Sequence, residues 1–162
     1  MGLAKLSLAM ERRCYFILKH LADRKSRKNP RPQHLITGER GEDAAYFHLR
    51  SLGYTVVARR WRADRIKGDL DLVAWDGDTL VIFEVKTRTA HDLAAAETQV
   101  DLHKQRTLRR MATAYLRQIP EHHRDRVPIR FDVLSVYLLP GGTEFEHFQA
   151  AFAYAELRRS GV

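Results

Sequence analysis

The sequence predicts a mixed α/β fold, in which one β-sheet is flanked by helices. Three observations favour this class: apolar residues at helical spacing in segments 37–52 and 97–118, β-branched runs within 54–63 and 127–139, and an Asp-Gly turn inside the apolar stretch 68–88. The expected order of elements in the compact part is helix, strand, β-hairpin, helix, strand, helix. The 162 residues are enough for one domain.

The first 34 residues are expected to form a basic N-terminal helix and linker, and residues 35–162 the compact domain. Residues 1–34 carry a net charge of +7, out of +8 for the whole chain. We expect a helix over 5–23 and a linker over 23–33, which contains two prolines. A basic arm favours a polyanionic partner, either nucleic acid or an anionic membrane surface, and a solubilising leader is the alternative.

Composition narrows the class of protein. No apolar run approaches the roughly 18 residues that cross a bilayer, so no stable membrane insertion is expected. The single cysteine, Cys14, cannot form an intramolecular disulfide or a thiolate metal cluster. These features lead us to expect a cytoplasmic protein.

The first helix of the compact domain is expected to begin at Thr37, whose hydroxyl can cap it, and to end at Gly53. A strand should follow over 54–63 and lead into a basic loop over 59–67. The hairpin strands are expected at about 69–75 and 79–87.

The second half of the domain should contain a helix, a strand and a further helix. Segment 97–118 has helical periodicity, and segment 127–139 is β-branched and ends before Gly141-Gly142. Phe145, Phe148 and Phe152 have helix-like spacing, although a short strand before that helix is an alternative. Asp132 is interpreted as pairing with Arg130 or making a strand-end contact.

The hairpin carries charged residues on one predicted face. A two-residue loop at Asp76-Gly77 puts Trp75 opposite Asp78, and therefore Asp69 opposite Glu84. Because strand residues alternate between faces, this register projects four charged side chains to one side and apolar ones to the other. The four are Asp69, Asp71, Glu84 and Lys86.

Carboxylates on one face repel unless a cation lies among them. Asp71 and Glu84 become diagonal neighbours, and hard oxygen ligands of this kind select Mg²⁺ or Mn²⁺. Lys86 adds a cation that can orient water or stabilise charge developing on a phosphate. The alternative interpretation is a salt-bridged sheet face with no catalytic role.

Asp71 followed by Glu84-Val85-Lys86 on the next strand resembles the PD-(D/E)xK nuclease superfamily. Blocks in order across about residues 38–152 resemble the bacterial YraN family, uncharacterised protein family 0102. The blocks are "GERGEDAAYFHLRSLGYTVVARRWR", "GDLDLVAWDGDTLVIFEVKTR", "KQRTLRRMATAYL", "RFDVLSV" and "EHFQAAF". Leu70 stands where the superfamily motif has proline, and Asp69 where the family often has Glu.

The resemblance implies a restriction-endonuclease-like mixed sheet flanked by helices, similar to archaeal Holliday-junction resolvases. It implies Asp71 and Glu84 as metal ligands, Lys86 as the catalytic lysine, and Glu42 as a helix-borne acid that completes a Mg²⁺ or Mn²⁺ site. The expected activity is metal-dependent hydrolysis of DNA phosphodiesters, in branched or structured DNA. The alternative is a nucleic-acid-binding protein of the same fold without catalysis.

Basic residues near the hairpin are candidates for contacts with backbone phosphates, and a solvated surface is the alternative for each. By analogy with resolvase-like relatives, a homodimer is expected. The candidate phosphate contacts are Arg59, Arg60, Arg62, Arg65, Lys67 and Lys104.

Overall fold

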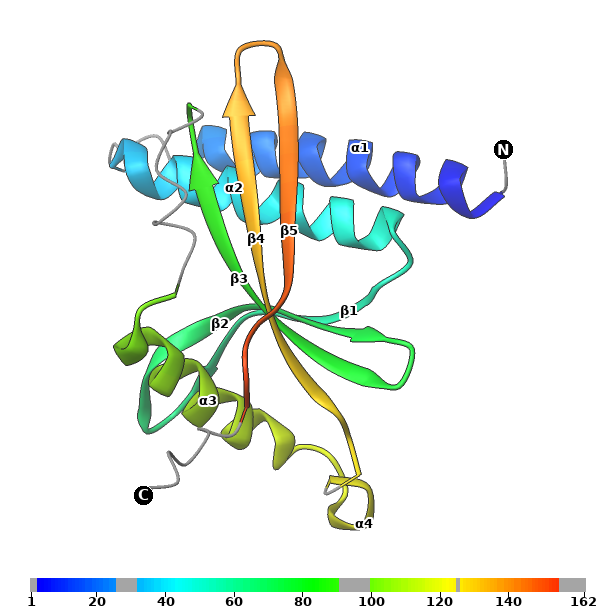
Figure 1. Cartoon of the computed structure of the whole chain (residues 1–162). Coiled ribbons are helices and arrows are strands. Elements are labelled where there is room, and N and C mark those ends of the chain that lie inside the picture. The colour runs from blue at the N-terminus through cyan, green and yellow to red at the C-terminus, as the bar shows by residue number, and fades with distance from the viewer. Residues whose placement is uncertain (1–2, 26–31, 91–99, 125, 155–162) are drawn as a thin grey trace.

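The computed structural model describes residues 3–25, 32–90, 100–124 and 126–154. One five-stranded mixed sheet lies at the centre, in the order β1-β2-β3-β4-β5, and helices cover both of its faces (Figure 1). The predicted α/β class is therefore confirmed. The helices are α1 Leu3–Lys25, α2 Gln33–Ser51, α3 Leu102–Leu116 and α4 Glu121–Arg124; the strands are β1 Thr55–Ala63, β2 Ile66–Asp76, β3 Thr79–Arg88, β4 Ile129–Leu139 and β5 Gly142–Phe152.

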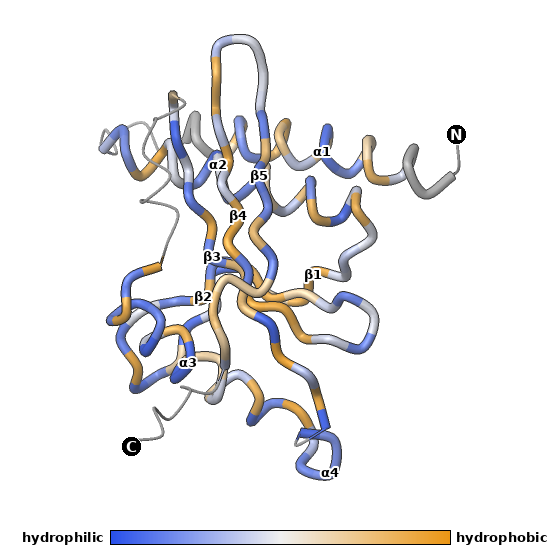
Figure 2. The backbone as a smooth tube through the Cα atoms, in the orientation of Figure 1, coloured by the Kyte–Doolittle hydropathy of each residue, from blue (hydrophilic) through white to orange (hydrophobic). Residues whose placement is uncertain are grey.

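Two apolar cores lie on opposite faces of the sheet. Leu108 and Met111 of α3 pack with Val73, Ile82 and other residues on one face. On the other face, residues of α2 pack with a second set, and Figure 2 shows the apolar residues gathered along the middle of the strands. This second core contains Ala45, Leu49, Leu72, Ala74, Val81, Phe83, Leu134 and Val136. The hairpin is thus apolar on both faces, and the predicted division into one charged and one apolar face was wrong: Leu70 belongs to the α3-side core, whereas Leu72 belongs to the α2-side core.

The strands pair antiparallel except for β3 and β4, which run parallel. The connection between these two strands includes α3, which covers one face of the sheet, as parallel crossovers require. This crossover brings the start of α3 beside the end of β3.

The C-terminal segment is a strand, β5, and the prediction of a helix there was wrong. Phe145 belongs to the α2-side core, whereas Phe148 and Phe152 pack against the α3-side core. In a strand that contributes apolar side chains to both cores, residues three apart lie on opposite faces, so helix-like spacing does not identify a helix. Phe148 and Phe152 are four residues apart and therefore share a face, and the register shift between them marks a bulge that includes Ala150, at φ 49°.

The predicted basic loop over 59–67 was also wrong, because most of it is paired strand. β1 and β2 form a hairpin whose turn contains only Asp64 and Arg65. The β-branched and aromatic residues of β1 continue the ladder through the arginines. Arg60 has a φ of 48°, and β1 changes register around this segment.

Two helix boundaries differ from the prediction. α2 begins at Gln33, directly after Pro32, rather than at Thr37, while Gly53 follows its end with a φ of 98°, as expected. α3 begins at Leu102, because the Asp101 side chain accepts a hydrogen bond from the Lys104 backbone N–H at 2.8 Å and caps the helix. Residues 97–99 of the predicted helix lie outside the described residues.

The predicted N-terminal helix is α1, and it packs along α2 (Figure 1). Asp43, a buried residue of α2, joins three elements: it accepts a hydrogen bond from the Tyr15 hydroxyl at 2.7 Å and ion pairs with Lys19 of α1 and Arg59 of β1. Burial alone would raise the pKa of the Asp43 carboxyl, but these bonds hold it below its ordinary value. The first helix is therefore anchored to the domain through these charged contacts, and the Tyr15 and Phe16 rings add contacts with Phe47 of α2.

α2 crosses β3 in close contact at Gly41. A Cβ atom at this position would lie 1.8 Å from Thr87 Oγ1 and 2.7 Å from Thr87 Cβ, and the β-branched threonine is stiff. The approach brings the next residue of α2, Glu42, to the pocket beside Asp71.

We expect Gly41→Ala to lower the free energy of unfolding by about 1–3 kcal/mol, because the added methyl overpacks this crossing. Gly38→Ala in the same helix is the matched control: nothing lies within 4 Å of its Cβ position, so it should stabilise the protein by up to about 1 kcal/mol. Urea unfolding measures both, and Thr87→Ala should partly rescue the Gly41 variant. Equal changes in the free energy of unfolding from the two glycine substitutions would contradict a close contact between Gly41 and Thr87.

Candidate active site

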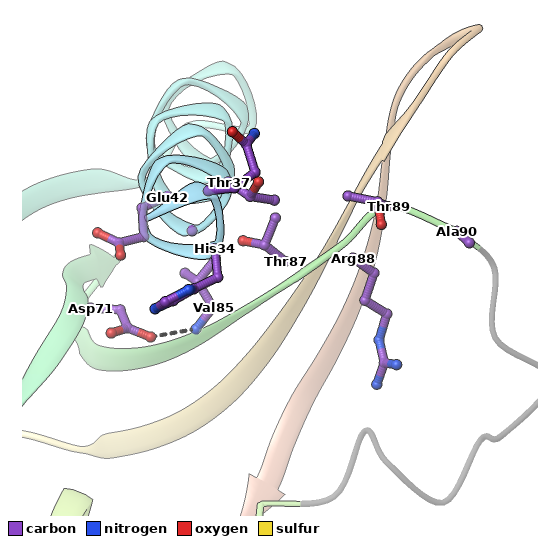
Figure 3. A pocket seen from close by; sticks show the side chains of 11 residues that line it. His34, Thr37, Glu42, Asp71, Val85, Thr87, Arg88, Thr89 and Ala90 are labelled. Carbon is purple, nitrogen blue, oxygen red and sulfur yellow. Dashed lines mark hydrogen bonds between the residues drawn. The ribbon is translucent and has the colours of Figure 1, made fainter. Parts of the chain in front are cut away.

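Asp71 and Glu84 lie where β2 and β3 diverge. The ladder between the strands runs from the pair Asp76 and Thr79 to the pair Leu72 and Phe83. Beyond it, the Asp71 carboxylate accepts a hydrogen bond from the Val85 backbone N–H at 2.8 Å (Figure 3). A side chain thus replaces a backbone partner at this point, and the opening between the strands is where the candidate site lies.

The hairpin register differs from the prediction by two residues. Gly77 and Asp78 form the loop, and Trp75 pairs with Leu80 instead of facing Asp78. Because the shift is even, it leaves the predicted faces of individual residues unchanged near the loop. Continued one step beyond Leu72 and Phe83, the register sets Asp71 opposite Glu84 rather than diagonal to it.

The two carboxyl groups interact strongly. Glu84 is only 8% exposed, and Asp71 is partly buried. Burial, followed by the nearby Glu84 charge, raises the pKa of Asp71 to about 7, although the Val85 N–H and the Lys104 charge oppose the rise. Near neutral pH, either a bound cation or a proton on Asp71 would therefore relieve the repulsion between the two carboxyl groups.

Lys104 reaches this pair from the first turn of α3. Its Nζ lies 2.9 Å from Glu84 Oε2. Burial would lower the pKa of Lys104, but the Glu84 charge and hydrogen bond raise it above its ordinary value, so the ammonium remains charged. The side chain expected to contact a phosphate backbone therefore lies against the acid pair, at the edge of the site.

Lys86 follows Glu84 by two residues on β3, so the two side chains share a face. It is partly buried. The pKa of Asp101 is held below its ordinary value by the Lys104 backbone N–H first, and the Lys86 charge contributes as well, which places Lys86 near the start of α3. Lys86 thus lies beside Glu84 on β3 and close to the start of α3, which also carries Lys104.

Glu42 and Asp71 line one pocket of about 750 Å³ between α2 and the end of β3. Figure 3 shows Glu42 and His34, both from α2, on the side of the pocket that Asp71 occupies. The Glu42 carboxylate is ion-paired with Nε of Arg60. The remaining lining residues are Gln33, Thr37, Gly38, Val85, Thr87, Arg88, Thr89 and Ala90.

The predicted phosphate contacts divide into two groups. Arg59 and Arg60 are ion-paired with α2, and Arg62 lies 3.5 Å from Asp69. Arg65 and Lys67 are exposed at the β1–β2 turn. Asp69 is thereby drawn toward Arg62, whereas Asp71 and Glu84 remain together.

The donor set fits a hard divalent cation in part. Two carboxylates, desolvated and repelling one another, favour Mg²⁺ or Mn²⁺, which keep several water ligands and need few protein donors. Among the described residues, however, no group of three or more His, Cys, Asp and Glu side chains lies close enough to hold a metal ion. Glu42, the expected third acid, is directed to Arg60.

Two features of the site were missed in the sequence. Lys104 at the acid pair could not be identified because it depends on how α3 docks against β3. The close contact between Gly41 and Thr87 could have been anticipated from the "RGED" run. A glycine inside a helical pattern often marks a close packing contact.

Residues 41–136 match the family model described as "Uncharacterised protein family UPF0102". The chain is similar to a UPF0102 protein of Koribacter versatilis, with 48% identity over 75% of this chain and 82% of that protein. It is also similar to UPF0102 proteins of Solibacter usitatus (40% identity, 84% of this chain and 98% of the relative) and of a Parafrankia species (42%, 71% and 94%). The matched segment contains Glu42, Asp71, Glu84, Lys86 and Lys104.

Proposed function

The chain belongs to the uncharacterised protein family UPF0102, and we propose that it is a metal-dependent endonuclease that hydrolyses DNA phosphodiesters. The observation that carries the proposal is the desolvated pair of Asp71 and Glu84 at the diverging ends of β2 and β3, flanked by Lys86. A carboxyl group with a strongly raised pKa beside a pocket, such as Asp71, is typical of functional sites, and burying two like charges together destabilises a fold.

Asp71 and Glu84 would hold Mg²⁺ or Mn²⁺. A bound cation of this type polarises a phosphate and lowers the pKa of a coordinated water. Lys86 then supplies a fixed positive charge, which can orient the attacking water or stabilise charge that develops on the phosphate oxygens.

Lys104 and Arg60 act on the acids. The Lys104 ammonium offsets the Glu84 charge, and Arg60 orients Glu42 at the pocket wall. Both would tune how strongly the carboxylates attract a cation, so we assign them positioning roles. Arg65 and Lys67, exposed at the β1–β2 turn and outside the ion pairs described for Arg59, Arg60 and Arg62, would contact backbone phosphates.

Branched or structured DNA is the proposed substrate class. The exposed basic residues of the β1–β2 turn could contact the phosphates of a duplex arm. The pocket at Asp71 could then receive a strand that is no longer base-paired. A panel of linear duplex, flap and four-way junction DNA, incubated with Mn²⁺, tests this. Wild-type protein should cleave one structure preferentially, and Glu84→Ala should cleave none.

Glu121→Gln, an exposed acid on α4, is the matched control and should cleave like the wild type. Equal products from the wild type and Glu84→Ala would indicate a contaminating nuclease and overturn the assignment.

A nucleic-acid-binding protein without catalysis is the second candidate. One observation favours it: Lys104 already balances Glu84, and no third ligand stands close by among the described residues. This reading predicts no carboxylate-dependent Mg²⁺ or Mn²⁺ binding by calorimetry, together with DNA binding that Asp71→Ala leaves unchanged. The endonuclease proposal predicts metal binding that Asp71→Ala removes.

A further inference from the structure

α1 presents a polar face to the domain. Its half-buried side chains are Leu8, Glu11, Tyr15 and Lys19, which recur at helical spacing. Glu11 Oε2 lies 2.6 Å from the Arg50 guanidinium, and Tyr15 and Lys19 bind Asp43, as described above. An ordinary surface helix buries an apolar stripe and exposes its charges, whereas α1 turns Glu11 and Lys19 inward, beside the Tyr15 and Phe16 rings that contact Phe47.

The opposite face of α1 is apolar and exposed. Met10, Ile17 and Leu21 are 62%, 52% and 51% exposed, and Leu18 beside them is 66% exposed. Figure 2 shows apolar residues recurring along α1, which lies outside α2 at the edge of the molecule. A contiguous apolar stripe of this kind is typical of a contact surface rather than of scattered surface residues.

A shallow groove of about 620 Å³ runs along this face. Arg12 lies over the Phe16 ring at 5.9 Å, and the exposed Arg13 and His20 stand at the rim. The lining residues are Ala9, Arg12, Arg13, Phe16, Ile17, His20 and Leu21.

The charges beside the groove have one sign. Among residues 7–22, where the structure describes the side chains, the sole carboxylate is Glu11, and it is engaged with Arg50 on the inner face. The outer face thus combines exposed apolar side chains with arginines and no acid. A complementary partner must be both apolar and anionic.

We propose that the outer face of α1 docks on an anionic phospholipid membrane surface. A helix lying in the interface places Met10, Ile17 and Leu21 among the acyl chains, while Arg13 meets the headgroups. Among the described residues, no helix is long and apolar enough to span a membrane, so the contact is peripheral.

Two other partners fit the surface less well. A second copy of α1 would bring the arginines of one helix against those of the other, with no carboxylate from residues 7–22 on that face. A nucleic acid would satisfy the arginines but would leave the apolar stripe in water. An amphiphilic anionic surface matches both the exposed apolar side chains and the arginines.

Co-sedimentation of the full chain with vesicles tests the proposal. Binding should be strong with vesicles that contain phosphatidylglycerol and weak with phosphatidylcholine alone. Ile17→Ser with Leu21→Ser should reduce binding by about tenfold or more, and Arg13→Gln by roughly fivefold, because both burial and charge contribute. All these side chains are exposed, so thermal melting should match that of the wild type.

Leu52→Ser is the matched control, because Leu52 is an equally exposed leucine at the end of α2. It should leave vesicle binding unchanged. Two outcomes would overturn the proposal. One is equal binding to both vesicle types. The other is an absence of vesicle binding together with a dimer or a DNA complex that is lost in the Ile17 and Leu21 variant. Cleavage of DNA by these variants should stay at the wild-type level, which separates this test from that of the endonuclease.

Discussion

Asp71→Asn is expected to remove the proposed nuclease activity and, without metal, to raise the stability of the protein. Asn retains a side-chain oxygen that can accept the Val85 N–H but supplies no negative charge. Because transition-state stabilisation is lost, the cleavage rate should fall by a factor on the order of 10²–10³ or more. The gain in stability arises because the wild type holds a desolvated carboxylate beside Glu84.

The sign of the pH dependence follows from the raised pKa. Folding favours the protonated form of Asp71, so the wild type loses stability as pH rises from the ordinary carboxyl range through about 7. The variant lacks this loss. The stability difference should therefore be small near pH 4 and reach on the order of 2–4 kcal/mol near pH 8, with Mg²⁺ reducing it by binding the wild type.

Urea unfolding of both proteins at several pH values, with and without Mg²⁺, measures these differences. Asp69→Asn is the matched control, because Asp69 lies two residues earlier and pairs with Arg62. It should change stability by less than about 1 kcal/mol. Asp71→Asn less stable than the wild type at pH 8 would contradict the repelling pair.

Asp132→Ala should cost about 3–5 kcal/mol in free energy of unfolding, because it breaks a buried charge network. Asp132 is 1% exposed and accepts hydrogen bonds from Arg130 Nε at 2.9 Å and from the Ala150 backbone N–H at 2.9 Å. His147 Nε2 lies 2.9 Å from its other oxygen. The carboxylate thus fixes the β5 bulge. The substitution leaves the Ala150 N–H without its partner and Arg130 with Asp76 and the Tyr54 hydroxyl alone of the partners described.

The penalty should shrink in acid. Burial would raise the pKa of Asp132, but bonds to His147, Arg130 and Ala150 hold it below its ordinary value, so its contribution is present above the ordinary carboxyl pKa and is lost as pH falls through the lowered one. Thermal or urea unfolding checks this, with the exposed Asp78→Ala as control. An equal cost for both variants would show that the network is not stabilising.

The sequence was informative where local chemistry decides the structure. Gly53 ends α2, and the interpretation that Asp132 pairs with Arg130 is confirmed. The C-terminal strand was mistaken for a helix because the sheet is covered on both faces, which removes the alternation that identifies a strand. The 59–67 segment was mistaken for a loop because arginines inside a strand can pair with acids on a helix above it.

The site was predictable to the extent that it is local. Asp71 and Glu84 lie on one hairpin, so a register error of two residues left them together. Contacts between distant elements were not visible: Lys104 reaches Glu84 only after α3 docks, and Arg60 reaches Glu42 only after β1 passes under α2. The metal ligands, the phosphate contacts and the homodimer remain predictions.

The pairing between β3 and β4 has a consequence for the order of folding. Each β3 residue from Leu80 to Arg88 pairs with the residue 49 positions later, whereas β1, β2 and β3 form a meander with short turns. Closing the long connection costs more chain entropy, so we expect the meander to form first. Asp71 and Glu84 then meet before Lys104 arrives to offset them, and the repulsion between them is a kinetic barrier that low pH should reduce.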